Sequence, residues 1–130
     1  GPQGYGDVRL GMSRERLEAL PHARVDRPAR CATFRVRVTD AGIEPGVSGI
    51  VERGRGVTSM ALAAPSSTPE GVGVGAAYRD VLLAYPRAEG DRQLLTVDVP
   101  RHPDRYYRFE LGPDGVASLL LVRHDQHCAG

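Results

Sequence analysis

Apolar and polar residues alternate along several stretches of this chain, as they do in strands that bury one face and expose the other. The clearest stretch is 32–38, where Phe34, Val36 and Val38 alternate with polar residues. The pattern recurs in shorter or weaker form, and we predict strands over 32–38, 47–52, 57–63, 95–99, 107–111 and 116–122. The last of these stretches is the most apolar.

Two other stretches have helical spacing. Ser13 is a good N-cap because its hydroxyl can accept a hydrogen bond from the first helical turn, and Pro21 ends the helix that follows. A second helix is predicted because four large residues lie at positions i, i+3, i+4 and i+7, and Pro86 ends it. These residues are Tyr78, Val81, Leu82 and Tyr85.

The same order of elements occurs twice along the chain. Gly11 corresponds to Gly75, Pro21 corresponds to Pro86, and 56–62 corresponds to 115–121. We therefore predict a single domain over 1–130 made of two repeats, about 7–63 and about 71–123, with a linker at about 64–70. Turns are expected at Asp40-Ala41-Gly42 and at Pro113-Asp114-Gly115.

A unit of one helix and three strands is marginally stable alone, so the two units should share one core. We predict an α+β fold in which two helix-plus-antiparallel-strand repeats form one continuous antiparallel sheet, with both helices packed on one face. The other face of the sheet would be open to solvent. By alternation this open face carries Arg35, Arg37, Thr96, Asp98, Tyr106, Arg108 and Glu110.

Composition narrows the classes of partner. All 17 basic residues are Arg, and the chain has no Lys, Trp or Asn, which is typical of a GC-rich genome of the actinobacterial type. The formal net charge is +1 and the arginines are dispersed, so we expect no nucleic-acid partner. No apolar run approaches the ~20 residues that a membrane span requires. The oligomeric state is left open.

Two cysteines, Cys31 and Cys128, lie at the start of one predicted strand and just beyond the last one. We predict a disulfide between them, although two free thiols would give the same even count. A disulfide favours an exported protein, secreted or in the cell envelope. Gly1-Pro2 is similar to a protease scar, so we expect any native signal peptide to have been removed.

The stretch Val8-Arg9-Leu10-Gly11-Met12-Ser13, followed by Leu17 and echoed at Gly75, carries a resemblance to known modules. It resembles the repeat of the β-lactamase inhibitor protein family. It is also similar to the small outer-membrane lipoproteins of the BamE/SmpA/OmlA type. The resemblance implies a tandem-repeat fold and, from the inhibitor family, binding of a protein by a concave sheet face.

Candidate catalytic and metal-binding motifs are weak. The segment His124-Asp125-Gln126-His127-Cys128 contains potential metal ligands, but a structural zinc site usually needs four at characteristic spacings. The glycines of 71–75 lack the spacing and the lysine of a phosphate-binding loop. No acidic pair has a spacing that singles it out for acid–base catalysis. We therefore expect no catalytic residues, no metal and no cofactor.

These observations predict an exported, non-catalytic protein-binding or inhibitor-like module. The partner is expected to be another extracellular or envelope protein. The open sheet face is the expected binding surface, because Tyr and Arg contribute disproportionately to interface energy. Its predicted binding residues are Arg35, Arg37, Tyr106, Arg108 and Glu110. The alternatives are a structural component of the cell envelope and, less favoured, a small metal-dependent or hydrolytic enzyme.

Overall fold

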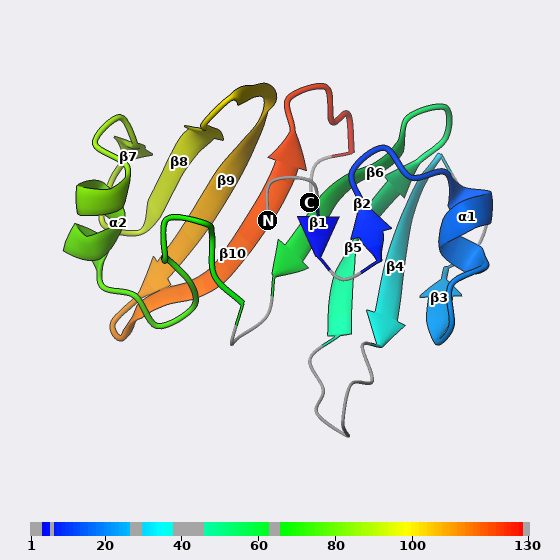
Figure 1. Cartoon of the computed structure of the whole chain (residues 1–130), viewed down its shortest axis with the longest axis horizontal. Helices are drawn as coiled ribbons and strands as arrows, with labels where there is room; N and C mark the ends of the chain where they lie inside the picture. The colour runs from blue at the N-terminus through cyan, green and yellow to red at the C-terminus, as the bar shows by residue number, and fades with distance from the viewer. Residues whose placement is uncertain (1–3, 6, 27–29, 38–45, 63–65, 129–130) are drawn as a thin grey trace.

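A single large sheet makes up most of the computed structural model, which describes residues 4–5, 7–26, 30–37, 46–62 and 66–128. Eight antiparallel strands lie in the order β3-β4-β5-β6-β10-β9-β8-β7, and β1 and β2 form a separate two-stranded sheet (Figure 1). The strands are β1 (Gly4–Tyr5), β2 (Val8–Arg9), β3 (Ala23–Val25), β4 (Cys31–Arg37), β5 (Gly46–Glu52), β6 (Gly56–Leu62), β7 (Glu89–Gly90), β8 (Leu94–Val99), β9 (His102–Gly112) and β10 (Gly115–Arg123).

The alternation of the sequence is realised in the strands. In β4, Phe34 and Val36 are buried whereas the residues on either side of them are exposed. Strands are present at all six predicted stretches, with ends displaced by a few residues. They form because each presents one continuous apolar face that a single core can cover.

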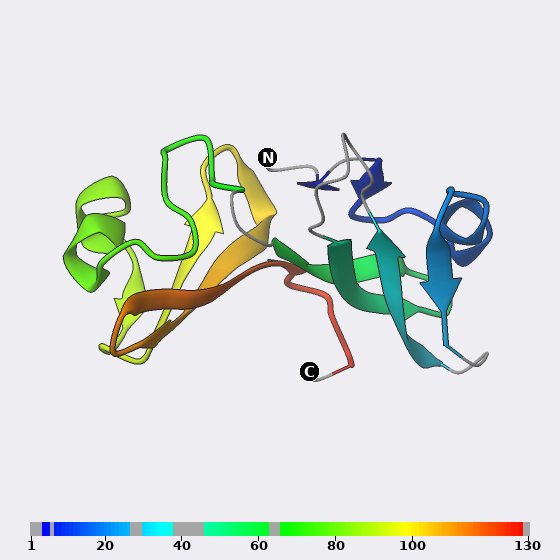
Figure 2. The ribbon, with the colours of Figure 1, turned by 90° about the horizontal axis from the view of Figure 1, so that it is seen from below.

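That core lies on one face of the sheet. Its largest fully buried side chains on the sheet are Tyr107, Phe109, Met60, Leu95, Leu119 and Leu121. Val8 from β2, Val72 and Tyr85 cover this face, and the Tyr85 ring lies 5.8 Å from the ring of Phe109. Figure 2 shows β1, β2 and the segment after β6 on one side of the sheet, and the C-terminal segment on the other.

The predicted fold class, α+β with both helices packed on one sheet face, is wrong. The two helices are only one or two turns long: α1 (Arg14–Glu18) and α2 (Tyr78–Ala84). Each has one fully buried residue, Leu17 or Val81, and the two helices lie at opposite ends of the sheet, beside its edge strands (Figure 1). About half of the described residues lie in strands, and helices this short cannot form the second layer of an α+β sandwich.

The edge strands explain the difference. Soon after Pro21 the chain pairs with the sheet as β3, and soon after Pro86 it pairs with the sheet as β7. Neither strand exceeds three residues, too few for alternation to be visible in the sequence. The predicted turn at Asp40-Ala41-Gly42, the Gly1-Pro2 start and residues 64–65 of the predicted linker lie outside the described residues.

Candidate functional site

One row of side chains crosses the whole exposed face of the sheet. It contains one residue from each strand, and each residue is directly opposite its neighbour in the next strand, so all eight share a face. None of the eight is buried. From β3 to β7 the row is Arg24, Arg35, Ser48, Ala61, Leu120, Arg108, Thr96 and Glu89, and we call it the open row.

The β3 and β4 end of the open row is strongly basic. Arg24 and Arg35 are directly opposite each other, and Arg37 lies two residues further along β4 on the same face. We call these three residues the arginine end. No hydrogen bond or ion pair is made by the side chains of Arg24 and Arg35 among the described residues. Like charges directly opposite each other destabilise a sheet, so this arrangement costs free energy unless an anion covers it.

The other predicted binding residues are already engaged within the protein. The Nε atom of Arg108 lies 3.2 Å from Oε2 of Glu110, and the Ser118 hydroxyl donates a hydrogen bond of 2.7 Å to Oε1 of Glu110. Arg35 and Arg108 are separated by four strand spacings, or about 19 Å. The five predicted residues therefore share a face but form two groups.

A second row beside the open row is covered by the end of the chain. This covered row is Ile50, Ser59, Val122, Tyr106 and Asp98. Residues 124–128, which we call the C-terminal segment, cross it from β8 towards β4. His124 Nε2 lies 2.7 Å from Asp98 Oδ1, and the His124 ring lies 4.8 Å from that of Tyr106. Ser59 and Val122 are only 4% and 3% exposed.

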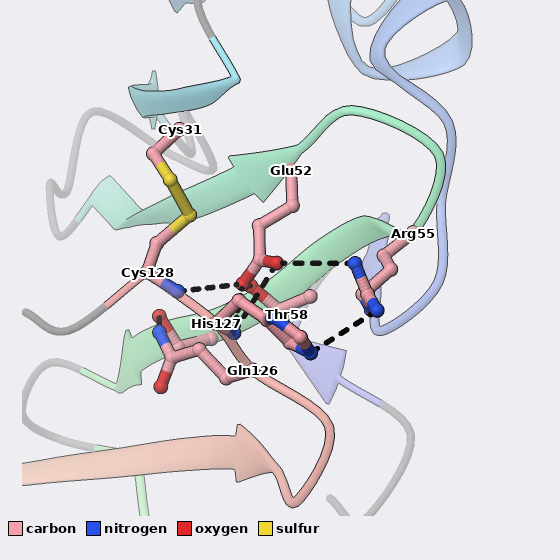
Figure 3. The surroundings of a disulfide bond; sticks show 8 residues. Cys31, Glu52, Arg55, Thr58, Gln126, His127 and Cys128 are labelled. Carbon is pink, nitrogen blue, oxygen red and sulfur yellow. Dashed lines mark hydrogen bonds and ion pairs between the residues drawn. A yellow bond between two sulfur atoms is a disulfide. The ribbon is translucent and has the colours of Figure 1, made fainter.

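The far end of the C-terminal segment is anchored by a disulfide and a buried carboxylate (Figure 3). Cys128 is bonded to Cys31, with their Cα atoms 5.8 Å apart, so the predicted disulfide is confirmed. Glu52 is 4% exposed and accepts hydrogen bonds from the N–H groups of His127 at 3.1 Å and Cys128 at 3.3 Å. The Thr58 hydroxyl donates a third, at 2.7 Å.

Two arginines support the turn that leads into this anchor. Arg123 pairs with Asp125 at 2.6 Å and donates a hydrogen bond of 3.0 Å to the carbonyl of Arg55. The Arg55 guanidinium lies 4.0 Å from Glu52 and 3.1 Å from Nε2 of His127. The arginines therefore surround the Glu52 carboxylate and the C-terminal segment with positive charge.

Sequence reasoning missed Glu52, although it is the main polar contact of the C-terminal segment. It follows Val51 at the end of a predicted strand, where an exposed carboxylate would be ordinary. Its partners lie 75 and 76 residues away. No local pattern could connect them.

The residues singled out for metal or nucleophilic chemistry have other contacts. Cys128 is in the disulfide, His124 contacts Asp98 and His127 contacts Arg55. Within the described residues, no group of three or more His, Cys, Asp or Glu side chains is arranged to hold a metal ion. The described helices are also too short to cross a membrane.

Comparison with known proteins identified no relative. No protein-family model, no curated protein and no solved structure matches this chain. The resemblance to the β-lactamase inhibitor and outer-membrane lipoprotein modules therefore stays a prediction. The functional argument depends on the geometry of the sheet face alone.

Proposed function

We propose that this protein is an exported, non-catalytic binding module that captures another extracellular or envelope protein on the open row. The partner presents carboxylates to the arginine end. The single observation that carries this proposal is the Arg24–Arg35 pair: two cations directly opposite each other, with no ion-pair partner among the described residues. The neighbouring carboxylate of Asp26 accepts a hydrogen bond from the Thr33 hydroxyl instead. The disulfide is compatible with an extracellular location.

Arginine suits this role better than other cations. Its planar guanidinium donates two parallel hydrogen bonds to a carboxylate, which gives both strength and orientation. A partner carboxylate placed between Arg24 and Arg35 would also remove their mutual repulsion. The free energy that this repulsion costs the free protein would thus be recovered on binding.

The middle of the open row permits close approach. Ser48 and Ala61 are small, and Leu120 is a partly exposed apolar residue beside them. A partner surface can therefore bury apolar area at the centre while its acidic residues meet the arginines. A polar rim around an apolar centre is the usual arrangement of a specific interface.

The test begins with capture from secreted and envelope fractions of the native organism. Each captured protein is then purified, and its Kd is measured against the wild type, R24Q/R35Q and the control R16Q/R79Q. Arg16 and Arg79 are exposed helix residues away from the sheet face. We expect R24Q/R35Q to weaken binding by about tenfold or more and the control to have little effect. Purified β-lactamases and extracellular proteases are screened in the same way.

Equal affinity of R24Q/R35Q and wild type for every purified candidate would contradict the proposal. Circular dichroism establishes that each variant is folded before the measurement. If no purified protein binds and the protein remains in the insoluble envelope fraction, the alternative of a structural envelope component is favoured instead.

A further inference from the structure

The C-terminal segment has no apolar anchor of its own. Residues 124–127 are all polar, three of them are exposed, and only Cys128 is buried. A segment that buries so little apolar surface gains little from the hydrophobic effect. Its position therefore depends on polar contacts and on the disulfide.

The polar contacts of residues 124–126 are exposed or long, whereas residues 127 and 128 bind one buried carboxylate, Glu52. His124 and Asp98 have side chains 49% and 62% exposed, and pairs this exposed contribute little. The bond from Gln126 to the Ser59 hydroxyl is 3.2 Å long, and those from the two N–H groups to Glu52 are 3.1 and 3.3 Å. The disulfide is the covalent connection between the segment and the sheet, and it holds the Cys128 N–H against Glu52.

The covered row lies directly beside the open row. Tyr106 is two residues from Arg108 on β9, and Val122 is two residues from Leu120 on β10. If the segment left, the two rows would become one surface, with an aromatic ring and a valine beside Arg108 and Leu120 in the middle of the sheet. Tyr and Arg are the residue types most enriched at interface hot spots.

We infer that the C-terminal segment is a redox-released cover of the binding face. In the oxidised protein it lies over the buried Val122 and against the partly buried Tyr106, and binding is limited to the open row. Reduction of Cys31–Cys128 frees the segment and strengthens partner binding. This inference deepens the proposed function and rests on it.

The reductant is a dithiol, from a protein or a small molecule. Cys31 is exposed, so a donor thiolate can attack its sulfur and form a mixed disulfide, which releases the Cys128 thiolate to take up a proton. The second donor thiol then attacks the mixed disulfide and leaves Cys31 as a thiol. Two electrons and two protons move from the donor, which ends as a disulfide.

Release is measured without any partner. In the oxidised protein the ring protons of His124 and Tyr106 should give a nuclear Overhauser effect, because their centroids are 4.8 Å apart. With dithiothreitol, or in C31S/C128S, we expect this effect to disappear. The fluorescence of added anilinonaphthalene sulfonate should rise several-fold as Val122 and Tyr106 become accessible. V122S in the C31S/C128S background should reduce that rise, whereas V74S, at an exposed valine outside both rows, should not.

Persistence of the His124–Tyr106 effect in the folded, reduced protein would overturn the inference. If C31S/C128S unfolds, the His124–Tyr106 effect is measured in sucrose, which favours the folded chain because it is excluded from protein surface. A folded C31S variant that ends at Arg123 lacks the C-terminal segment and is a second test. Dye fluorescence no higher than in the oxidised wild type would show that the segment does not cover the binding face.

Binding of a purified partner then separates the two proposals. Release of the segment with unchanged partner affinity would refute the regulation but leave docking at the arginine end intact. Unchanged affinity of R24Q/R35Q would refute the proposed function, whatever the segment does. A gain of affinity on reduction, lost in Y106S, supports both.

Discussion

The half of the sheet from β3 to β6 and the half from β7 to β10 share their strand order, read from either edge to the centre, but differ on the exposed face. The first half has Arg24 and Arg35 opposite each other with no ion-pair partner among the described residues, and it holds the anchor of the C-terminal segment. The second half pairs its charges internally, as in Arg108–Glu110. The halves therefore share a strand order, while the Arg24–Arg35 pair in the open row belongs to the first half.

The shared arrangement is closest at two glycines. The N–H of Val57 donates to the carbonyl of Met12 at 2.9 Å, and the N–H of Val116 donates to that of Ala76 at 2.8 Å. Gly56 and Gly115 precede these residues with φ of +77° and +101°. Both strands thus begin against the loop before a helix, in a conformation that favours glycine.

The largest expected difference between the halves comes from the disulfide. Removing it in C31S/C128S frees a loop of 97 residues and should lower the free energy of unfolding by about 4–5 kcal/mol in the chain-entropy model. Urea unfolding measures the loss. Amides that exchange by local opening should exchange faster mainly in β4 and β5, near Cys31 and Glu52. An equal rise of local opening in β8 and β9 would contradict the assignment of the anchor to the first half.

The glycine pair tests whether the two halves are built alike. A Cβ at position 56 would lie 2.5 Å from the Met12 carbonyl, and one at position 115 would lie 2.4 Å from that of Ala76. We expect Gly56→Ala and Gly115→Ala each to cost about 2–5 kcal/mol from strain and crowding. Gly54→Ala is the control, because it has positive φ but open space. A loss in only one half would break the comparison.

The second half has an aromatic core that makes it sensitive to alkali. Burial, with a smaller effect of the Glu70 charge, raises the pKa of Tyr107 to about 12. Because the unfolded pKa is about 10, this stabilisation is complete below pH 10 and is lost as the pH rises to 12, by about 2–3 kcal/mol. Burial also raises the pKa of Tyr85. Tyr107→Phe should therefore flatten the pH dependence of the melting temperature above pH 10, and Tyr78→Phe serves as the control. An unchanged pH profile in Tyr107→Phe would refute the assignment of this alkali sensitivity to Tyr107.

The smallest expected contrast is at the helix starts. The Ser13 hydroxyl accepts a hydrogen bond from the Arg16 N–H at 3.2 Å, whereas Ala77 has no side-chain acceptor and only its N–H is bound, by Asp80. Ser13→Ala should cost about 1 kcal/mol and Ala77→Ser should gain a similar amount. Thermal melts of both variants measure this, and a loss in Ala77→Ser would show that the α2 cap is not limiting.

Much of the sheet could be predicted from the sequence, because a half-buried strand produces a period of two. Both helices lie within a few residues of their predicted positions, but their place beside the edge strands could not be predicted, because β3 and β7 are too short to show alternation. The disulfide followed from two cysteines at strand ends. The hold of Glu52 on the C-terminal segment could not be foreseen, because it joins positions 75 residues apart. The packing of the His124 ring against Tyr106 could not be predicted from a local pattern either.

The central claim is that the arginine end binds carboxylates. A titration of the oxidised, isotope-labelled protein with an oligoglutamate peptide, followed by amide chemical shifts, tests it most directly. The account predicts the largest shifts at Arg24, Arg35 and Ser48, and their loss in R24Q/R35Q. Shifts that are absent, or spread evenly over the exposed arginines Arg16 and Arg79, would contradict it.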